Sequence, residues 1–378
     1  MGTERRMDPS TCSSPVKVLD LFAGAGGLSL GFRQASDRYI TSRAVEFDVP
    51  AAATYTANHG DVVYAGGIHE WLRDEDVPDV DLVIGGPPCQ GFSALGRQDV
   101  EDDRNTLWHE YAETVRRSRP SYFVLENVGP FERSPQYQHF REATQTDGIL
   151  REYDFHSSIL NAADYGAAQA RRRCIVLGHH RDLPFPGWPE PTAAQERWST
   201  VGNALTRVRR SVTSVDLPER AVAFHGRDMP GAFRSDELHI GRNYTDLSLK
   251  RFRSIPAGGN RFDLPEHLKA PCWRRHHSGS GDVMGRLSWD KPSVTIRTEF
   301  FKPEKGRYLH PTEHRAITHY EAALIQGFPD DYLWVGSKVA IARQIGNAVP
   351  IALGAAVGNH IMSILRPEPA NVGKRIGA

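Results

Sequence analysis

The chain has 378 residues, of which 39% are hydrophobic and 24% are charged, as in ordinary soluble globular proteins. Its 46 Lys and Arg residues balance its 46 Asp and Glu residues, so the whole chain lacks the positive excess of a general polyanion binder. No run approaches the roughly 18 apolar residues of a membrane span, and the N-terminal segment lacks the apolar core of a secretory signal.

The first part of the chain alternates short apolar runs with longer amphipathic segments. Strands are predicted over residues 16–24, 42–48, 80–88 and 122–128, with helices over 28–35 and 105–120. A further strand and turn follow over 155–166, and another strand over 171–180. Strands that alternate with helices in this way predict an α/β fold with a mostly parallel sheet and helices on both faces.

After residue 182 the sequence changes character. A proline-rich passage leads into residues 201–290, which are irregular and rich in Arg, Gly and His. Residues 205–290 contain 15 Lys and Arg and 10 Asp and Glu, a local excess of +5 (15 − 10). This excess is typical either of a solvated basic face or of a module that binds nucleic acid. Regular patterns return from residue 291, with helices predicted over 319–329 and 349–365.

The four cysteines, Cys12, Cys89, Cys174 and Cys272, are scattered and form no CxxC pair. This spacing predicts neither a disulfide framework nor a zinc site, and it favours a reducing, cytoplasmic environment. Cys272 lies near His276 and His277, but adjacent histidines in a Gly- and Ser-rich stretch rarely bind one metal together. No metal is therefore predicted.

A glycine-rich turn follows the first predicted strand in DLFAGAGGLSLGF, where Gly24, Gly26 and Gly27 precede a helix. Glycines at such a turn allow close approach of a ligand, although a simple tight turn would also use them. The second strand ends at Glu46, where a carboxylate can accept hydrogen bonds from a ribose diol. Together the two features favour an adenosine-bearing cofactor, and S-adenosylmethionine fits.

Cys89 lies in GGPPCQGFS, directly after a predicted strand and behind two prolines. A structural cysteine is usually buried among aliphatic residues, whereas this one is presented on a loop as a nucleophile would be. Three more segments are equivocal when taken alone. Glu126 in ENV is either a helix cap or a carboxylate at the ligand-binding edge of an open α/β sheet. QARRR (169–173) begins a strand, where alternation puts Arg171 and Arg173 on one face and Arg172 on the other, and a solvated edge would account for them. Asn347 in QIGNAVP could be a helix cap.

Taken in order, DLFAGAGGLSLGF, PPCQGFS, ENV, QARRR and QIGNAVP resemble the motif series of the C5-cytosine-specific DNA methyltransferases of bacterial type. The resemblance covers residues 16–181 and 291–360. It implies a Rossmann-like, S-adenosylmethionine-dependent methyltransferase sheet with a second, smaller, loop-rich target recognition domain. The expected boundaries are tails at 1–15 and 367–378, a catalytic and cofactor-binding domain at 16–182 and 291–366, and a recognition domain at 183–290.

By this resemblance Cys89 is the nucleophile that adds to C6 of a cytosine. Such an adduct makes C5 reactive enough to accept a methyl group, which splits one difficult step into two. Glu126 would act at N3 of the ring, and Arg173, with Arg171 beside it, would hold O2. The target base has to leave the duplex to meet these groups.

The resemblance also implies a cofactor site that yields S-adenosylhomocysteine as product. The residues expected there are Phe22, Gly24, Gly27, Glu46, Phe47, Ile68, Leu107, Asn347 and Val349. The sequence departs from the family at Gly67, where an acidic residue often meets the adenine amino group. Asp61 or a backbone carbonyl could replace it.

Double-stranded DNA is the expected partner, with a cognate restriction endonuclease as a functional one, and a monomer is expected. Gln90, Ser93, Arg251, Arg253 and Arg261 are predicted DNA contacts, either with phosphates or with guanine. Two alternatives stay open: a tRNA cytosine-C5 methyltransferase and a catalytically inactive DNA-binding homologue. The intact set Cys89, Glu126, Arg171 and Arg173 argues against the second.

Overall fold

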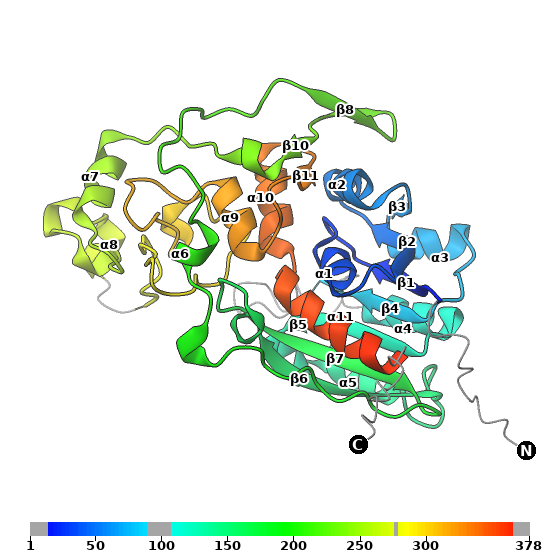
Figure 1. Cartoon of the computed structure of the whole chain (residues 1–378). Coiled ribbons are helices and arrows are strands. Elements are labelled where there is room, and N and C mark those ends of the chain that lie inside the picture. The colour runs from blue at the N-terminus through cyan, green and yellow to red at the C-terminus, as the bar shows by residue number, and fades with distance from the viewer. Residues whose placement is uncertain (1–13, 89–106, 276–278, 366–378) are drawn as a thin grey trace, which may run out of the picture.

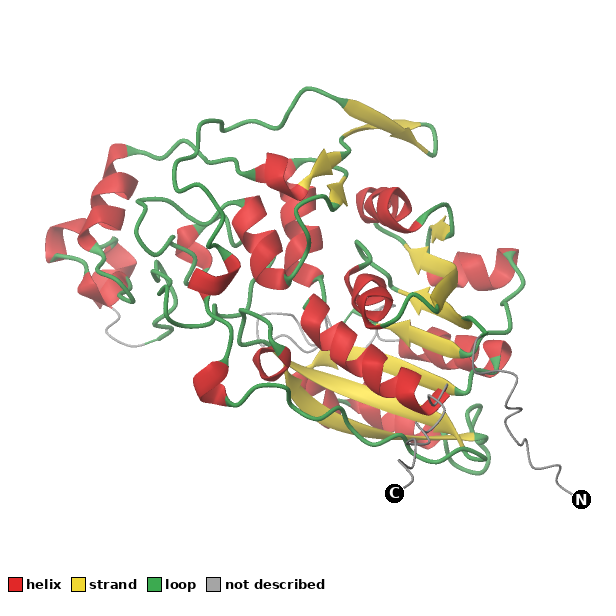
Figure 2. Cartoon of the chain, in the orientation of Figure 1, coloured by secondary structure: helices red, strands yellow, loops and turns green. Residues whose placement is uncertain are grey.

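The computed structural model describes residues 14–88, 107–275 and 279–365. A seven-stranded sheet forms the centre of one half of the molecule, and a loop-rich lobe forms the other half (Figures 1 and 2). Both predicted tails fall almost entirely outside the described residues, as do Cys89, Gln90, Ser93, His276 and His277.

The sheet has the strand order β3-β2-β1-β4-β5-β7-β6. Its strands are β1 (Val16–Leu21), β2 (Tyr39–Glu46), β3 (Val63–Ala65), β4 (Leu82–Gly85), β5 (Tyr122–Val128), β6 (Tyr153–Asn161) and β7 (Arg172–His180). Pairing is parallel from β3 to β5, whereas β7 runs antiparallel to both of its neighbours. The predicted mostly parallel sheet is thus confirmed, and β3 is a strand that the sequence pattern did not predict.

Helices cover both faces of this sheet (Figure 1). They are α1 (Gly27–Ala35), α2 (Val49–His59), α3 (Ile68–Asp74), α4 (Leu107–Ser118), α5 (Pro135–Ala143) and, from the end of the chain, α11 (Ile351–Leu365). On one face, Trp71, Tyr111 and Phe140 pack against β4, β5 and their neighbours. On the other, α11 packs on α1 so closely that a Cβ atom on Gly31 would lie 2.8 Å from the Ile351 carbonyl oxygen.

The second lobe contains short elements joined by long loops. They are α6 (Val201–Ala204), β8 (Ala221–Phe224), β9 (Arg227–Pro230), β10 (Phe233–Arg234), α7 (Asp246–Ser254), α8 (Pro271–Arg275), α9 (His319–Gln326), β11 (Leu333–Trp334) and α10 (Lys338–Asn347). One apolar cluster joins Val201 and Phe233 to Phe300, Trp334 and Ile341. The core of this lobe therefore includes residues on both sides of position 290.

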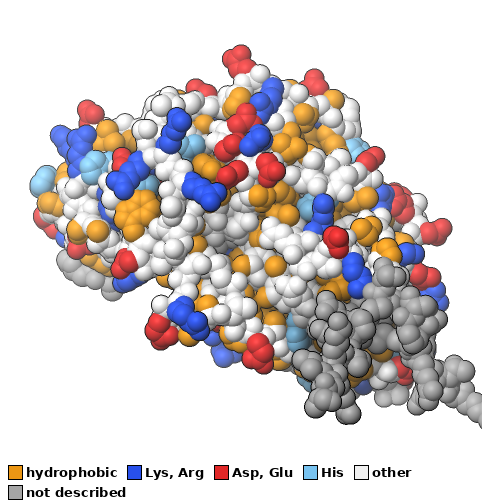
Figure 3. Space-filling view, viewed as in Figure 1, with side chains coloured by type: hydrophobic (Ala, Val, Ile, Leu, Met, Phe, Trp, Pro, Cys, Tyr) orange, Lys and Arg blue, Asp and Glu red, His pale blue; other side chains and the backbone are white. Residues whose placement is uncertain are grey.

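A smaller apolar cluster lies at the outer end of the lobe, around α7 and α8, and includes Phe252, Leu264 and Met284. Basic and acidic side chains are interspersed on the face seen in Figure 3, without a continuous basic surface. Within the described ranges, no single helix has the length and apolar composition of a membrane span. Helices α10 and α11 reach these values only as a pair that is bent by 42°.

Candidate active site

Three neighbouring strands, β1, β4 and β5, end at the same edge of the sheet. Because they are parallel and adjacent, the residues that follow Leu21, Gly85 and Leu125 come together there. Ligands of open α/β sheets bind at such carboxyl edges. The segments DLFAGAGG, GGPP and ENV, which lie far apart in the sequence, thus meet at one place.

Glu126 and Arg173 form an ion pair at this edge. Arg173 Nε lies 2.7 Å from Glu126 Oε1, and the two side chains are only 13% and 12% exposed. The antiparallel pairing of β5 with β7 brings them together, since Val128 stands opposite Arg173 and Glu126 opposite Ile175. A carboxyl group and a guanidinium held side by side can bind one planar ring together. The carboxyl group can share a proton with a ring nitrogen, and the guanidinium can donate to a carbonyl oxygen of the same ring.

The backbone that leads toward Cys89 packs directly on this pair. A Cβ atom on Gly86 would lie 3.0 Å from Glu126 Oε2, so only glycine leaves the carboxylate its present room. Asn127 donates its side-chain N–H to the Pro87 carbonyl oxygen at 3.1 Å. The described chain stops at Pro88. Glu126 and Asn127 together therefore fix the segment that immediately precedes Cys89, which itself lies outside the described residues.

Arg171 is buried, and its guanidinium contacts the second lobe. Its Nη1 donates to the Ile296 carbonyl oxygen at 2.8 Å, and both Nη atoms donate to that of Gly346 at 3.1 Å. Burial lowers the pKa of this guanidinium to about 9, and the nearby Arg173 adds to the effect. The structure thus brings Arg173, but not the Nη atoms of Arg171, into contact with Glu126.

The glycine-rich turn after β1 is held by Glu46. The Gly24 N–H donates to Glu46 Oε2 at 2.8 Å, and the Asp48 N–H donates to Oε1 at 2.7 Å. Phe22 and Gly24 have φ angles of 56° and 55°, and nothing lies within 4 Å of where a Gly24 Cβ atom would be. Burial raises the pKa of Glu46 to about 7 despite these bonds.

The other predicted cofactor residues surround the same edge. Gly27 begins α1 and lies against Val349, Ile68 begins α3, and Leu107 begins α4. Phe47 is 76% exposed beside Glu46. Asn347 is exposed and ends α10, so it does not cap α11, which starts at Ile351.

Asp61 does not replace the missing acidic residue at Gly67. Glu46 pairs with Ala65 in the parallel ladder of β2 and β3, and Asp61 precedes β3. It therefore lies at the amino edge of the sheet, opposite the cofactor residues. Gly67 caps α3, and its N–H donates to Glu70 Oε2 at 3.0 Å.

Asp20 is a polar group at this edge that sequence reasoning missed. It is 1% exposed, accepts a 2.6 Å hydrogen bond from Ser29 Oγ, and leaves its Oδ1 without a hydrogen-bond partner. Burial raises its pKa to about 7, and the charge of Glu46 adds to the rise. The available signal was a carboxylate inside the apolar strand VKVLDL, where a charged residue needs a reason.

The predicted DNA contacts of the second lobe differ from one another. Arg251 donates from Nε to the Leu268 carbonyl oxygen at 2.8 Å and lies over the Trp273 ring. Arg261 is half-buried, with its guanidinium over the Phe262 ring. Arg253, by contrast, is exposed on α7.

A group that could hold a metal lies away from this edge, on β6 and β7. Asp154, His156 and His179 place one ligand atom each within 4.8 Å of the others. However, Asp154 is ion-paired with Arg141 and Arg181 at 3.2 and 3.7 Å. These arginines already compensate its charge, and we assign no metal there.

Comparison with known proteins points in one direction. The profile of the family described as C-5 cytosine-specific DNA methylase matches residues 16–363. The type II methyltransferase M.XorII of Xanthomonas oryzae is 34% identical over 93% of this chain and 85% of its own length. The type II methyltransferase M1.HphI of Haemophilus parahaemolyticus is 32% identical over 92% and 86%. A solved structure described as a DNA modification methyltransferase from an E. coli prophage superposes with a TM-score of 0.68 at 25% identity, covering 93% of this chain and 99% of its own.

Proposed function

The chain belongs to the C-5 cytosine-specific DNA methylase family and is a DNA (cytosine-5)-methyltransferase, and from that premise we propose how its residues carry the reaction. We propose that Cys89 is the nucleophile and that Glu126 and Arg173 hold the flipped cytosine. The observation that carries this proposal is the Glu126–Arg173 ion pair, placed against the Gly86–Pro87 backbone that leads to Cys89.

In the proposed reaction the Cys89 thiolate forms a bond to C6, and the C5=C6 electron pair becomes available at C5. C5 then takes the methyl group. Loss of the C5 proton returns an electron pair to the ring, the C5=C6 bond reforms, and the thiolate leaves. The cytosine has to be flipped out of the duplex, since none of these atoms is reachable in a stacked base pair.

The Glu126 carboxyl group would hold or share a proton with N3 while charge builds on the ring. Arg173 would donate to O2 from Nη2, because its Nε pairs with Glu126 and its Nη1 donates to the Arg172 carbonyl oxygen at 2.8 Å. Arg171 is a positioning residue in this scheme. Its bonds to Ile296 and Gly346 fix the start of β7, and therefore Arg173, against the second lobe.

The residues present fit S-adenosylmethionine, which supplies a methyl group on a sulfonium when bound. The space above Gly24 is open, and the Glu46 carboxylate is fixed by two backbone N–H groups beside the exposed Phe47. Glu46 would accept from the ribose hydroxyls, and Phe47 and Ile68 would contact the adenine. Phe22, Gly27, Leu107, Asn347 and Val349 would complete the site. A backbone carbonyl near Gly67 would meet the adenine amino group.

We further propose that residues 183–290 select the DNA sequence. Within this segment Arg253 would contact DNA, with Gln90 and Ser93 contributing from outside the described ranges. The protein would act as a cytoplasmic monomer that protects DNA from a cognate restriction endonuclease. The relatives named as type II methyltransferases support this context.

Nucleoside mass spectrometry tests the proposal. Purified protein and S-adenosylmethionine are incubated with unmethylated duplex DNA and, in parallel, with bulk tRNA. We expect 5-methyldeoxycytidine in the DNA only, and bisulfite sequencing of that DNA then identifies the target sequence. The Cys89→Ala protein should give no product while it still binds S-adenosylhomocysteine. Undiminished activity of this variant would overturn the nucleophile assignment.

A further inference from the structure

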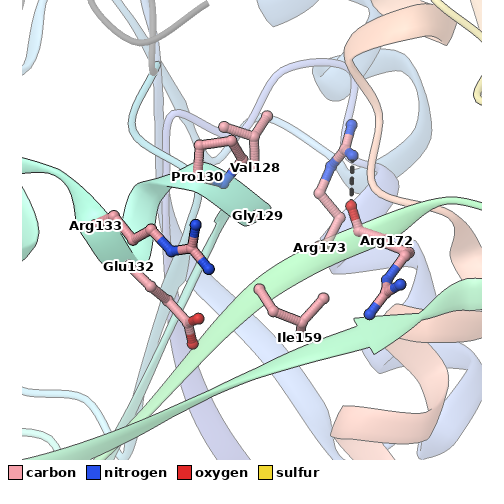
Figure 4. Close-up of a pocket in the computed structure, with 8 residues that line it drawn as sticks. All are labelled: Val128, Gly129, Pro130, Glu132, Arg133, Ile159, Arg172 and Arg173. Carbon is pink, nitrogen blue, oxygen red and sulfur yellow. Dashed lines mark hydrogen bonds between the residues drawn. The ribbon is translucent and has the colours of Figure 1, made fainter.

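A cavity lined by arginines lies next to the Glu126–Arg173 pair. An open cavity of about 530 Å³ lies between β7 and η3 (Gly129–Arg133), the short helix that follows β5. Arg133 reaches into it from η3, and Arg172 reaches into it from β7 (Figure 4). Arg173 also lines the cavity, so the cavity opens directly beside the proposed base-binding pair.

The guanidinium groups of Arg133 and Arg172 bind no other group of the described chain, although the Arg172 backbone belongs to β7. Both are exposed, and no hydrogen bond or ion pair within the described part of the chain involves either guanidinium. This sets them apart from Arg171 and Arg173, whose guanidinium groups are engaged. Two unpaired guanidinium groups on opposite walls of one cavity are available for an anion from outside.

Part of the lining is apolar. Val128, Pro130 and Ile159 belong to it, and Ile159 lies between Arg133 and Arg172 in Figure 4. Glu132 is the acidic residue of the lining, and it forms no ion pair with Arg133 or Arg172. Arg173 is paired with Glu126, so the remaining charges of the lining are those of Arg133, Arg172 and Glu132. Together they leave one net positive charge beside the apolar side chains. This combination suits a sugar–phosphate unit, whose sugar could contact the apolar side chains while its phosphate accepts from the guanidinium groups.

We propose that Arg133 and Arg172 bind a phosphodiester of the DNA strand that carries the target cytosine, next to the flipped nucleotide. This inference rests on the proposed function, because the ligand is the backbone of the same substrate. Arg173 contacts the flipped base and also lines the cavity, so the occupant of the cavity is the backbone adjoining that base. The contact holds the strand in the conformation that keeps the base out of the stack.

The test combines variants of the protein with neutral phosphates in the DNA. Once bisulfite sequencing has identified the target, short duplexes are prepared in which one phosphodiester at a time, on either side of the target cytosine, is a neutral methylphosphonate. With the unmodified protein we expect kcat/KM to fall about tenfold at one of these positions, as for the loss of one charge-assisted hydrogen bond.

The Arg133→Gln/Arg172→Gln protein should lose about the same factor on unmodified DNA and should lose little more at that methylphosphonate. Its affinity for S-adenosylhomocysteine should be unchanged, which shows that it folds. Charge-matched controls are Lys17→Gln and Arg151→Gln in one protein, because both side chains are exposed at the opposite edge of the sheet. This control should keep the unmodified kcat/KM and the full methylphosphonate effect.

Two results would overturn the inference. One is a kcat/KM of the arginine variant on unmodified DNA that equals the kcat/KM of the control. The other is that each methylphosphonate lowers the kcat/KM of the arginine variant by the same factor as that of the unmodified protein. If the unmodified protein forms no 5-methyldeoxycytidine in any DNA, the proposed function itself fails. That outcome is distinct, because it is seen before any variant is made.

Discussion

The cofactor edge of the sheet and the second lobe differ in how side chains bind backbone groups that have no partner within a helix or strand. At the cofactor edge these groups are N–H donors at turns and helix starts, and carboxylates accept hydrogen bonds from them. Glu46 accepts from Gly24 and Asp48, Asp48 accepts from Ala51, and Glu70 accepts from Gly67. In the second lobe the backbone groups without such a partner are carbonyl oxygens of long loops, and arginines donate hydrogen bonds to them.

Arg286 is the clearest case in that lobe. It is 3% exposed and donates to the carbonyl oxygens of Phe252, Ile255, His310 and Glu313 at 2.6 to 3.0 Å. Arg307 binds four further carbonyls from nearby loops. Some of the basic residues that give this lobe its positive excess therefore hold its loops together, so the excess alone does not indicate how many of them bind DNA.

The largest expected effect is that of Arg286→Met. This change removes the donors of four carbonyl oxygens that have little access to water, so we expect the free energy of unfolding to fall by roughly 5 kcal/mol. Chemical denaturation measures it. Arg253→Met, on the exposed face of α7, is the control and should change stability by less than about 0.5 kcal/mol. Equal effects of the two changes would remove the distinction between structural and free arginines.

At the cofactor edge the corresponding test uses pH. The Asp20 carboxyl has its pKa raised from 3.8 to about 7 by burial, so the folded protein keeps a proton that the unfolded chain has already lost. Stability is then fully present below about pH 4 and falls as the pH rises toward about 7, by up to roughly 4 kcal/mol from this group. Denaturation at several pH values measures this decrease.

The Asp20→Asn variant separates this carboxyl from the others. It should match the unmodified protein at low pH and exceed its stability above pH 7, because amide and carboxyl differ only once the carboxyl ionises. Glu46 adds a decrease of the same sign in both proteins, since its pKa is also raised to about 7. Parallel pH curves for the two proteins would show that Asp20 is not the group responsible.

A smaller effect is expected on cofactor affinity. Glu46→Gln keeps an oxygen acceptor for Gly24 but loses the bond from the Asp48 N–H and the charge that strengthens a bond to a ribose hydroxyl, so affinity for S-adenosylhomocysteine should fall about tenfold. Calorimetric titration measures it. Affinity of the unmodified protein should also rise with pH through about 7, as Glu46 ionises, and this dependence should weaken in the variant. A pH-independent affinity in both proteins would contradict the role of the charge.

The sequence predicted what depends on local pattern. Its alternation of strands and helices predicted β1, β2 and β4 to β7, and the ends of β2 and β5 placed Glu46 and Glu126 at one edge. It missed β3, which has only three residues, and α2, whose run VPAAATYTANH has no clear apolar stripe. It also could not show that residues before and after 290 share one core, because that contact joins Val201 and Phe233 to Phe300 across long loops.

The partners of individual side chains were the least predictable feature. Arg171 and Arg173 are two residues apart at the start of β7, a spacing that predicts the same face, yet one binds Ile296 and Gly346 in the second lobe and the other binds Glu126. Arg251 and Arg253 likewise share a helix but have different surroundings. Which carbonyl or carboxylate lies within reach is decided by tertiary contacts that no short pattern contains.

The smallest expected effect therefore separates that last pair of arginines. Arg253→Gln should leave stability unchanged and lower the slope of log affinity for duplex DNA against log salt by about 1, as expected for one lost phosphate contact. Arg251→Gln loses the bond to Leu268 and the Trp273 contact, so it should lower the free energy of unfolding by about 1 kcal/mol. Its salt slope should stay nearly unchanged. In a reversed result, Arg251→Gln rather than Arg253→Gln would lower the slope of log affinity against log salt. An arginine bound to a carbonyl oxygen through Nε would then still offer its Nη atoms to DNA. The difference between the two regions would be one of degree.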